Sequence, residues 1–286
     1  MKNRTIPNFL IIGAGKSGTS SLHEYLNQHP EIFMSPVKEP MYFRYGYGTE
    51  KLKHDEKSYV KVLYDTKDKY LQLFKDVENE KIVGESSVTY LANPASAQRI
   101  KDFNPNMKLL AVLRNPVERA FSFYKMSVRM GLEKKSFKRA VNEELVGKRE
   151  NDIQLRRYLF MSKSYDSIRV YNNHFDEKKF KIFLYEDLKK KDSFFKELFD
   201  FLEVDNSIKI NTDIKHNISS QVPYHPFFRS LYSMLRKHQL FTLIFLKKQY
   251  LPELSMELRS FLVDYFREDT KSLQGLIGRD LKHWMY

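Results

Sequence analysis

The stretch that decides the fold is Phe9-Leu-Ile-Ile-Gly-Ala-Gly-Lys-Ser-Gly-Thr-Ser-Ser21, where an apolar run leads into a loop of glycine and hydroxyl residues. The apolar run predicts a buried strand, and the glycines let the backbone turn tightly and approach a ligand closely. A helix beginning after the loop would point its N-terminal amides at an anion. Lys16 adds a mobile positive charge, while Thr19 and Ser20 add hydroxyl donors. The stretch therefore predicts an anion-binding strand–loop–helix unit.

This loop differs from a Walker A sequence, which requires Gly-Lys-[Ser/Thr] at its end. Here Thr19 follows Gly18 directly, and the lysine stands earlier, at Lys16. The hydroxyl residue that would hold Mg²⁺ in an NTPase thus lacks its usual lysine neighbour, and no acidic metal ligand clearly ends a following strand, although Glu85 is a candidate. We therefore expect no metal ion at the loop, and a P-loop nucleotide kinase or NTPase is the competing interpretation.

Apolar runs alternate with helical patterns along the chain. The expected strands are residues 9–13, 31–34, 81–86, 108–114 and 181–185, and the expected helices are 19–28, one opening at Asn93-Pro94, 116–130, 193–202 and 254–266. This alternation predicts an α/β fold with a P-loop-like parallel sheet flanked by helices, in a single domain of residues 1–286 with a mainly helical C-terminal third. The charged stretch 133–156 is expected to be a mobile or substrate-facing insertion.

The charge balance favours an anionic partner. The 286 residues include 49 Lys and Arg against 36 Asp and Glu, a net charge of +13, and 42% are hydrophobic, which is enough for a substantial core. Because the basic residues are scattered rather than gathered in one arm, we expect no nucleic-acid partner. A non-enzymatic module that binds polyanions is the second competing interpretation.

The cellular context follows from what the sequence lacks. The absence of cysteine excludes disulfides and thiolate metal sites and suits a cytoplasmic protein. The apolar run 240–246 is far shorter than the ~20 residues that span a bilayer. Its flank, Lys247-Lys248, leaves peripheral membrane contact open, and the oligomeric state is also open.

A second anion site is predicted in Leu109-Leu-Ala-Val-Leu-Arg-Asn-Pro-Val-Glu-Arg-Ala-Phe-Ser122. Arg114 ends a buried strand, and Asn115 with Pro116 can open the next helix. Ser122 lies two turns into that helix. Ligands of open α/β sheets bind at the carboxyl edge, where Arg114 and Ser122 can converge on one phosphate. A capping or ion-pairing role for Arg114 is the alternative.

Several blocks in a fixed order carry a resemblance to sulfotransferases that use 3'-phosphoadenosine 5'-phosphosulfate (PAPS). The loop GAGKSGTSS resembles their 5'-phosphosulfate loop, and LRNPVERAFSFY resembles their 3'-phosphate motif. Three more blocks are similar to segments of the same superfamily: Lys38-Glu-Pro40 with Tyr42-Phe43, Tyr185-Glu-Asp-Leu188 and Leu276-Ile-Gly-Arg-Asp-Leu-Lys-His-Trp284. The blocks run from about residue 9 to 284 and most resemble bacterial and heparan-sulfate-type members.

The resemblance implies PAPS as the sulfuryl donor, with no metal. It implies that the 5'-phosphosulfate is held by Gly15, Lys16, Ser17, Gly18, Thr19 and Ser20. It also implies that Arg114 and Ser122 hold the 3'-phosphate, and that Lys16 stabilises charge on the leaving group. The nearest match to the family's late cofactor loop is residues 216–223, to which we assign no contact.

Transfer to a hydroxyl needs a proton acceptor near the nucleophile. His23 and His29 are expected to be surface or packing residues, and His54 lies in a charged stretch. Glu85 instead ends an apolar strand, and the segment 83–90 resembles the strand with the catalytic glutamate of heparan-sulfate-type sulfotransferases. We therefore predict Glu85 as the base, with a structural role for it as the alternative.

These predictions together describe a sulfotransferase that moves a sulfuryl group from PAPS to a hydroxyl or amino group by in-line displacement. The expected acceptor is a carbohydrate, as a glycan or glycolipid, because the positive charge favours an anionic glycan. Another small hydroxyl compound or a peptide tyrosine remains an alternative, since a fold does not determine a substrate.

Overall fold

The structure is a computed structural model that describes residues 6–44, 64–213 and 253–286. Three predictions fall outside the described residues: His54, the loop at 216–223 and the apolar run at 240–246. In the described part of the chain, no helix is both long enough and apolar enough to cross a membrane.

The first structural feature is a five-stranded sheet in which every strand pairs in parallel, in the order β2-β3-β1-β4-β5. Its strands are β1 (Phe9–Gly13), β2 (Ile32–Met34), β3 (Ile82–Ser86), β4 (Lys108–Leu113) and β5 (Phe180–Leu184). The parallel sheet confirms the predicted fold class. β1 takes the central place, with Leu10 opposite both Glu85 on β3 and Leu109 on β4.

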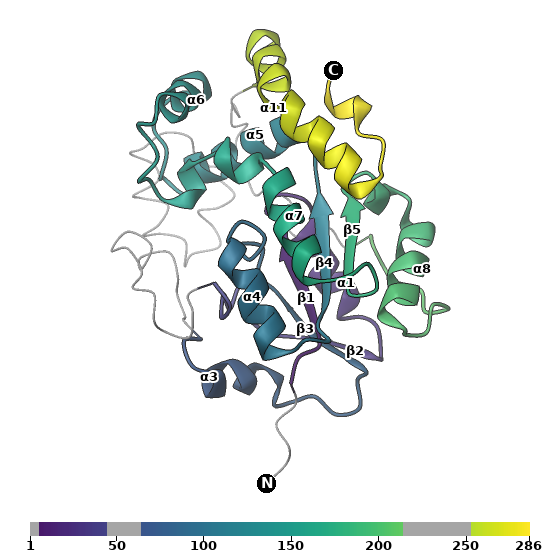
Figure 1. Cartoon of the computed structure of the whole chain (residues 1–286). Coiled ribbons are helices and arrows are strands. Elements are labelled where there is room, and N and C mark those ends of the chain that lie inside the picture. The colour runs from purple at the N-terminus through teal and green to yellow at the C-terminus, as the bar shows by residue number, and fades with distance from the viewer. Residues whose placement is uncertain (1–5, 45–63, 214–252) are drawn as a thin grey trace, which may run out of the picture. The chain divides into compact units, whose positions relative to one another are not determined.

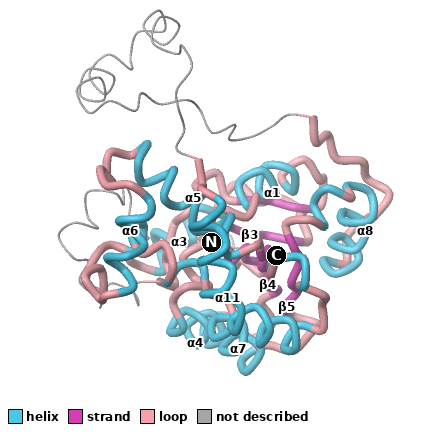
Figure 2. The backbone as a smooth tube through the Cα atoms, turned by 90° about the horizontal axis from the view of Figure 1, so that it is seen from above, coloured by secondary structure: helices cyan, strands magenta, loops and turns pink. Residues whose placement is uncertain are grey.

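Helices lie on both faces of the sheet, as Figures 1 and 2 show. The α-helices are α1 (Thr19–Leu26), α3 (Lys67–Leu71), α4 (Pro94–Phe103), α5 (Pro116–Arg129), α6 (Phe137–Leu145), α7 (Tyr165–His174), α8 (Lys191–Leu202) and α11 (Met256–Ile277). Short 3-10 turns lie at 72–74, 154–156, 160–162, 187–189 and 282–284. In Figure 2, α1 and α8 cover one face of the sheet, and α4 and α7 cover the other.

Alternation along the strands explains the two packed faces. Phe9 and Ile11 belong to one buried cluster together with Leu22 of α1 and Phe199 of α8. Leu10 and Ile12 are equally buried, and their side chains leave the strand on the opposite side. Burying each such side chain contributes roughly 1.5–3 kcal/mol, so the sheet is held firmly from both sides.

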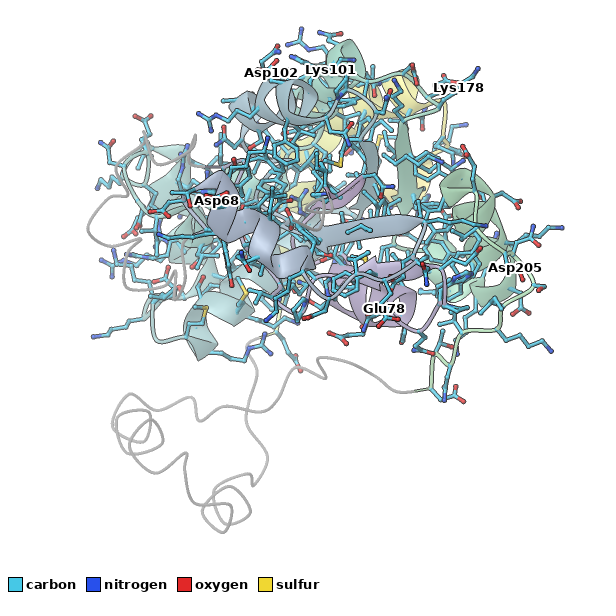
Figure 3. The ribbon with its side chains drawn as sticks, turned by 90° about the horizontal axis from the view of Figure 1, so that it is seen from below. Asp68, Glu78, Lys101, Asp102, Lys178 and Asp205 are labelled. Atoms are coloured by element: carbon cyan, nitrogen blue, oxygen red, sulfur yellow. The ribbon has the colours of Figure 1, made fainter. Side chains whose placement is uncertain are left out.

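On the second face, hydrogen bonds also join α7 to the segment after β3 and α4 to α7. The Tyr171 hydroxyl of α7 donates to the carbonyl of Tyr90, which follows β3, at 3.0 Å. Lys101 of α4, labelled in Figure 3, donates to the carbonyl of His174 at 2.8 Å. The first of these bonds holds the segment after β3, which carries part of the candidate site.

The chain forms two compact units. The first contains residues 1–114, 164–216 and 272–279, and the second contains 115–163, 217–271 and 280–286. The sheet with α1, α3, α4, α7 and α8 belongs to the first unit, while α5 and α6 belong to the second. A single domain over residues 1–286 stays a prediction.

The stretch 133–156, predicted to be a mobile or substrate-facing insertion, contains α6 and a buried ion cluster. Ser136 accepts a hydrogen bond from the Arg139 amide and begins the helix. Arg149, with only 2% of its side chain exposed, pairs with Glu133 at 2.7 Å and with Glu143 at 2.9 Å. Some of the charged side chains in this stretch therefore pair with one another in the interior of the second unit instead of facing solvent.

The ends of the predicted elements mostly agree with the structure to within about two residues. The main difference is α11, which ends at Ile277, whereas the amphipathic pattern predicted an end at residue 266. Its C-terminal part is more polar, so the apolar periodicity weakens before the helix ends.

Candidate functional site

The loop between β1 and α1 has the backbone that its glycines predict. Gly18 stands at the N-cap of α1 with φ of 86°, in the left-handed region, and Lys16 also has a positive φ of 69°. A Cβ on Gly18 would lie 3.1 Å from Leu188 Cδ2 and 3.3 Å from the Tyr185 ring. Both the backbone conformation and the close packing therefore require glycine here.

The loop also contains a buried polar atom that fits an anionic ligand. Ser17 is fully buried, and its Oγ has no hydrogen-bond partner among the described residues. A buried hydroxyl without a partner costs about 1–3 kcal/mol. No side chain caps the N-terminus of α1, so its first amides also lack that kind of partner. A phosphate or phosphosulfate in the loop would satisfy both.

Arg114 lies beside this loop. Its Nη1 donates to the carbonyl of Lys16 at 3.0 Å, and its guanidinium lies 4.7 Å from the centre of the Tyr185 ring. The predicted proximity of Arg114 to the glycine loop is thus present in the first unit. Ser122, half-buried on α5, belongs to the second unit, so its convergence with Arg114 on one phosphate stays a prediction.

Two blocks that are distant in sequence meet next to the loop. Tyr185 and Leu188 approach Gly18, as described above. Between them, Asp187 accepts a hydrogen bond from the Leu184 amide at 2.8 Å and pairs with Arg279 at 2.9 Å. Arg279 comes from the C-terminal block 276–284, so that block supports the segment packed on the loop.

Glu85 lies in β3 next to β1, but it is fully buried. Three hydroxyl groups surround its carboxyl group: that of Tyr90 at 2.7 Å, that of Ser87 at 2.9 Å and that of Tyr70 at 3.5 Å. Burial raises the pKa of Glu85 to about 8, against the opposing effect of these hydrogen bonds. The carboxyl group is therefore largely protonated at neutral pH.

A second carboxylate, Glu39, reaches the same region from the segment after β2. Its amide donates to the carbonyl of Ser86 at 2.9 Å, and its Oε2 accepts from the Val88 amide at 3.1 Å. A quarter of its side chain is exposed. Burial of the rest raises the pKa of Glu39, and the charge and hydrogen bond of Lys38 act in the opposite direction.

Lys38 connects Glu39 to the loop. Its Nζ lies 2.8 Å from Ser20 Oγ and 3.4 Å from Glu39 Oε1. Lys38-Glu-Pro40 is part of the family resemblance in the sequence, but neither Lys38 nor Glu39 was predicted to have a role in the site. That block was the signal that could have identified both residues.

The histidines predicted to be surface or packing residues are both buried. His23 on α1 places Nδ1 2.8 Å from Ser86 Oγ, and burial lowers the pKa of its imidazole. His29 places Nε2 2.9 Å from the carbonyl of Asp205 and packs edge-on against Phe199. Both therefore act in the packing of α1 and its following turn.

Comparison with known proteins agrees with this geometry. The model of the sulfotransferase domain family matches residues 7–242. The chain belongs to this family. It is a sulfotransferase domain enzyme of a family whose donor is generally PAPS, which agrees with the resemblance described above.

Its relatives include a crystal structure of a sulfotransferase from Alicyclobacillus acidocaldarius, similar over 99% of this chain and 100% of that one, with a TM-score of 0.79 and 30% identity. The membrane-associated sulfotransferase kil1 of Dictyostelium discoideum is 34% identical over 147 residues, or 49% of this chain and 28% of kil1. Human heparan sulfate glucosamine 3-O-sulfotransferase 6 is 31% identical over 121 residues, or 42% of this chain and 30% of that enzyme. The matches thus span less than a third of the length of these curated relatives.

Proposed function

We propose that the protein transfers the sulfuryl group of PAPS to a hydroxyl or amino group of a carbohydrate. The observation that carries the donor assignment is the buried Ser17 hydroxyl in a glycine loop flanked by Lys16 and Arg114. The names of relatives that act on heparan sulfate and other carbohydrates support the acceptor class. The net charge of +13 supports it as well, because sulfated and uronic glycans are anionic.

In this proposal the loop residues bind the donor and stabilise charge. Gly15 to Ser20 hold the 5'-phosphosulfate, and Arg114 with Ser122 hold the 3'-phosphate. The acceptor oxygen or nitrogen forms a bond to sulfur while the bond from sulfur to the phosphate oxygen breaks. Lys16 stabilises the negative charge that develops on that oxygen, which leaves with adenosine 3',5'-bisphosphate.

The proton released by the acceptor goes to a carboxylate, and two candidates are present. Glu85 is the base that the sequence predicts. Its complete burial and its pKa of about 8 favour a protonated, structural group instead. Glu39 is partly exposed, and Lys38 contacts both it and Ser20 of the loop. Burial raises the pKa of Glu39 above its usual value, which is the direction that suits a base. The geometry thus favours Glu39.

Donor binding tests the proposal first. Adenosine 3',5'-bisphosphate should raise the melting temperature without Mg²⁺, since a ligand that binds only the native state stabilises it by mass action. A shift that appears with ATP and Mg²⁺ but not with this nucleotide would indicate the kinase alternative. Radiolabelled PAPS should then label at least one acceptor in a panel of N-desulfated heparan sulfate, chondroitin and 4-nitrophenol.

The base is assigned by comparing two isosteric variants in the same transfer assay. Glu39→Gln should bind adenosine 3',5'-bisphosphate normally but lose turnover by about 10²–10⁴-fold, because an amide accepts no proton. Glu85→Gln should retain most of its turnover at neutral pH. The reverse pattern would restore Glu85 as the base and exclude Glu39.

A further inference from the structure

Lys38 occupies a position that the proposed chemistry does not yet use. It follows a turn whose backbone is joined to β3, because the Ser35 amide donates to the carbonyl of Gly84 at 2.8 Å. From there its ammonium group reaches both Ser20 Oγ and Glu39 Oε1, at 2.8 and 3.4 Å. One cation therefore contacts a hydroxyl of the anion-binding loop and a carboxylate on another segment.

We propose that Lys38 is a positioning residue that holds the Glu39 carboxylate beside the loop and ready to accept a proton. The inference rests on the proposed function, in which Glu39 is the base and Ser20 contacts the donor. The inference adds a residue that contacts both Glu39 and Ser20. A single side chain would then orient the proton acceptor relative to the sulfuryl group of the donor.

The surroundings of Glu39 show why a cation is needed there. Burial disfavours its ionised form, and the neighbouring Glu85 is a second acidic group whose pKa rises further through the charge of Glu39. Lys38 and Arg44 favour the ionised form, as does the hydrogen bond from the Val88 amide. Lys38 is the larger of the two cationic influences, and its ammonium group lies within hydrogen-bond distance of Glu39 Oε1.

The groups around Lys38 indicate whether it stabilises the fold or positions Glu39. Burial lowers the pKa of His23, and the charge of Lys38 lowers it further, so both favour a neutral imidazole beside the Lys38–Glu39 pair. With 28% of its side chain exposed, Lys38 is still within reach of solvent and ligand. Both side chains are about a quarter exposed, so solvent screens the pair in part and limits what it adds to stability. Its geometry is therefore better explained by alignment than by stabilisation of the fold.

The test compares Lys38→Met with Lys38→Arg, and Lys108→Met is the matched control. Lys108 pairs with Glu203 at 2.8 Å, also in the first unit. It begins β4, so it lies at the sheet edge opposite the carboxyl ends of the strands where the loop is found. Lys108→Met therefore removes a lysine–carboxylate pair without touching the site.

The first readout is the titration of the Glu39 carboxyl carbon by NMR in ¹³C-glutamate-labelled protein, assigned with Glu39→Gln. Because an opposite charge within about 4–6 Å lowers the pKa of an acid by roughly 1–3 units, Lys38→Met should raise the midpoint by about one unit or more. Lys38→Arg should keep the wild-type midpoint, and Lys108→Met should leave it unchanged. If Lys38→Met fails to fold, Lys38→Gln is measured instead.

The second readout is the pH profile of kcat/KM with labelled PAPS and the panel acceptor that is sulfated fastest. Its acidic limb should move up in Lys38→Met by the same amount as the NMR midpoint. An unmoved midpoint, or a moved midpoint with an unmoved limb, would overturn the positioning role. A fully active Glu39→Gln would instead refute the base assignment, and a panel without any product would refute the proposed function, so the three failures are distinguishable.

Discussion

Replacing Glu85 by glutamine tests the conclusion that this carboxyl group is protonated in the native protein. The pKa of Glu85 rises through burial from 4.5 to about 8, which makes its folded pKa higher than its unfolded one. Between these values the native state binds a proton that the unfolded state has released. The free energy of unfolding therefore falls as the pH rises through this window. The stability that the protonated Glu85 contributes is fully present only below about pH 4.5.

The size of the change in stability follows from the difference between the unfolded and folded pKa of Glu85. A titration difference of one unit corresponds to about 1.4 kcal/mol, so Glu85 should lower the free energy of unfolding by about 1.4 kcal/mol per pH unit inside the window. Glutamine keeps the shape and neutrality of the protonated acid. The variant should therefore lose this part of the slope, and it should gain stability relative to wild type as the pH rises.

Urea unfolding at pH 5, 6, 7 and 8 measures the effect as the difference between variant and wild type, in which the other titrating groups cancel. Glu24→Gln, on the exposed surface of α1, controls for the loss of one carboxylate. Parallel curves for Glu85→Gln and wild type would show that Glu85 titrates alike in both states. Combined with a turnover loss of about 10²–10⁴-fold, parallel curves would return Glu85 to the role of base.

Two further variants test the donor site and the second unit. Arg114→Ala should raise the KM for PAPS about ten- to a hundredfold at nearly constant kcat, because a phosphate remote from sulfur is bound alike in ground and transition states; normal PAPS affinity by calorimetry would remove Arg114 from the site. Arg149→Met should lower the free energy of unfolding by about 3–5 kcal/mol, since it removes the direct cationic partner of the buried Glu133 and leaves only Arg156, at 3.9 Å, among the described residues. The control Lys138→Met, which loses an exposed pair with Glu257, should cost under about 1 kcal/mol in urea unfolding, and an equal cost for both variants would contradict this account.

The parts of the fold that the sequence predicted are those determined locally. β1 spans Phe9–Gly13, as predicted, because an all-apolar run between a proline and a glycine loop has few alternatives. The helix of α5 begins at Pro116 after Asn115, whose side chain accepts from the Val117 and Glu118 amides. Capping residues of this kind are visible in one sequence without knowledge of the rest of the chain.

The buried ion cluster of stretch 133–156 was not predictable from the sequence, for a physical reason. Counted along the sequence, its charged residues suggest a solvated segment. In the structure, Arg149 meets Glu133 across sixteen positions and is almost fully buried with it. The pairing depends on how α6 folds back within its unit, and no local pattern of charge specifies that.

The candidate site was predictable in its elements and less so in its electrostatics. Arg114 and the glycine loop were both placed correctly at the carboxyl edge of the sheet, because strand–loop–helix patterns fix where such residues stand. For Glu85 the position on its strand was visible, but β3 is buried throughout. With no exposed face to provide a contrast, the strand pattern could not show that three hydroxyl groups would enclose the carboxyl group.

The two carboxyl groups are best understood as one site that favours a single negative charge. The charge of Glu39 is one of the influences that raise the pKa of Glu85, so ionisation of one opposes ionisation of the other. Hydroxyl groups surround Glu85, which suits a neutral acid, whereas Lys38 and the Val88 amide contact Glu39, which suits an anion. The environment thus separates the two groups into one that keeps its proton and one that can accept a proton, which is how paired acids acquire different roles at one pH. In the proposed function, the buried Glu85 packs against its hydroxyl neighbours as a neutral acid, and the partly exposed Glu39, aligned by Lys38, accepts the proton of the acceptor.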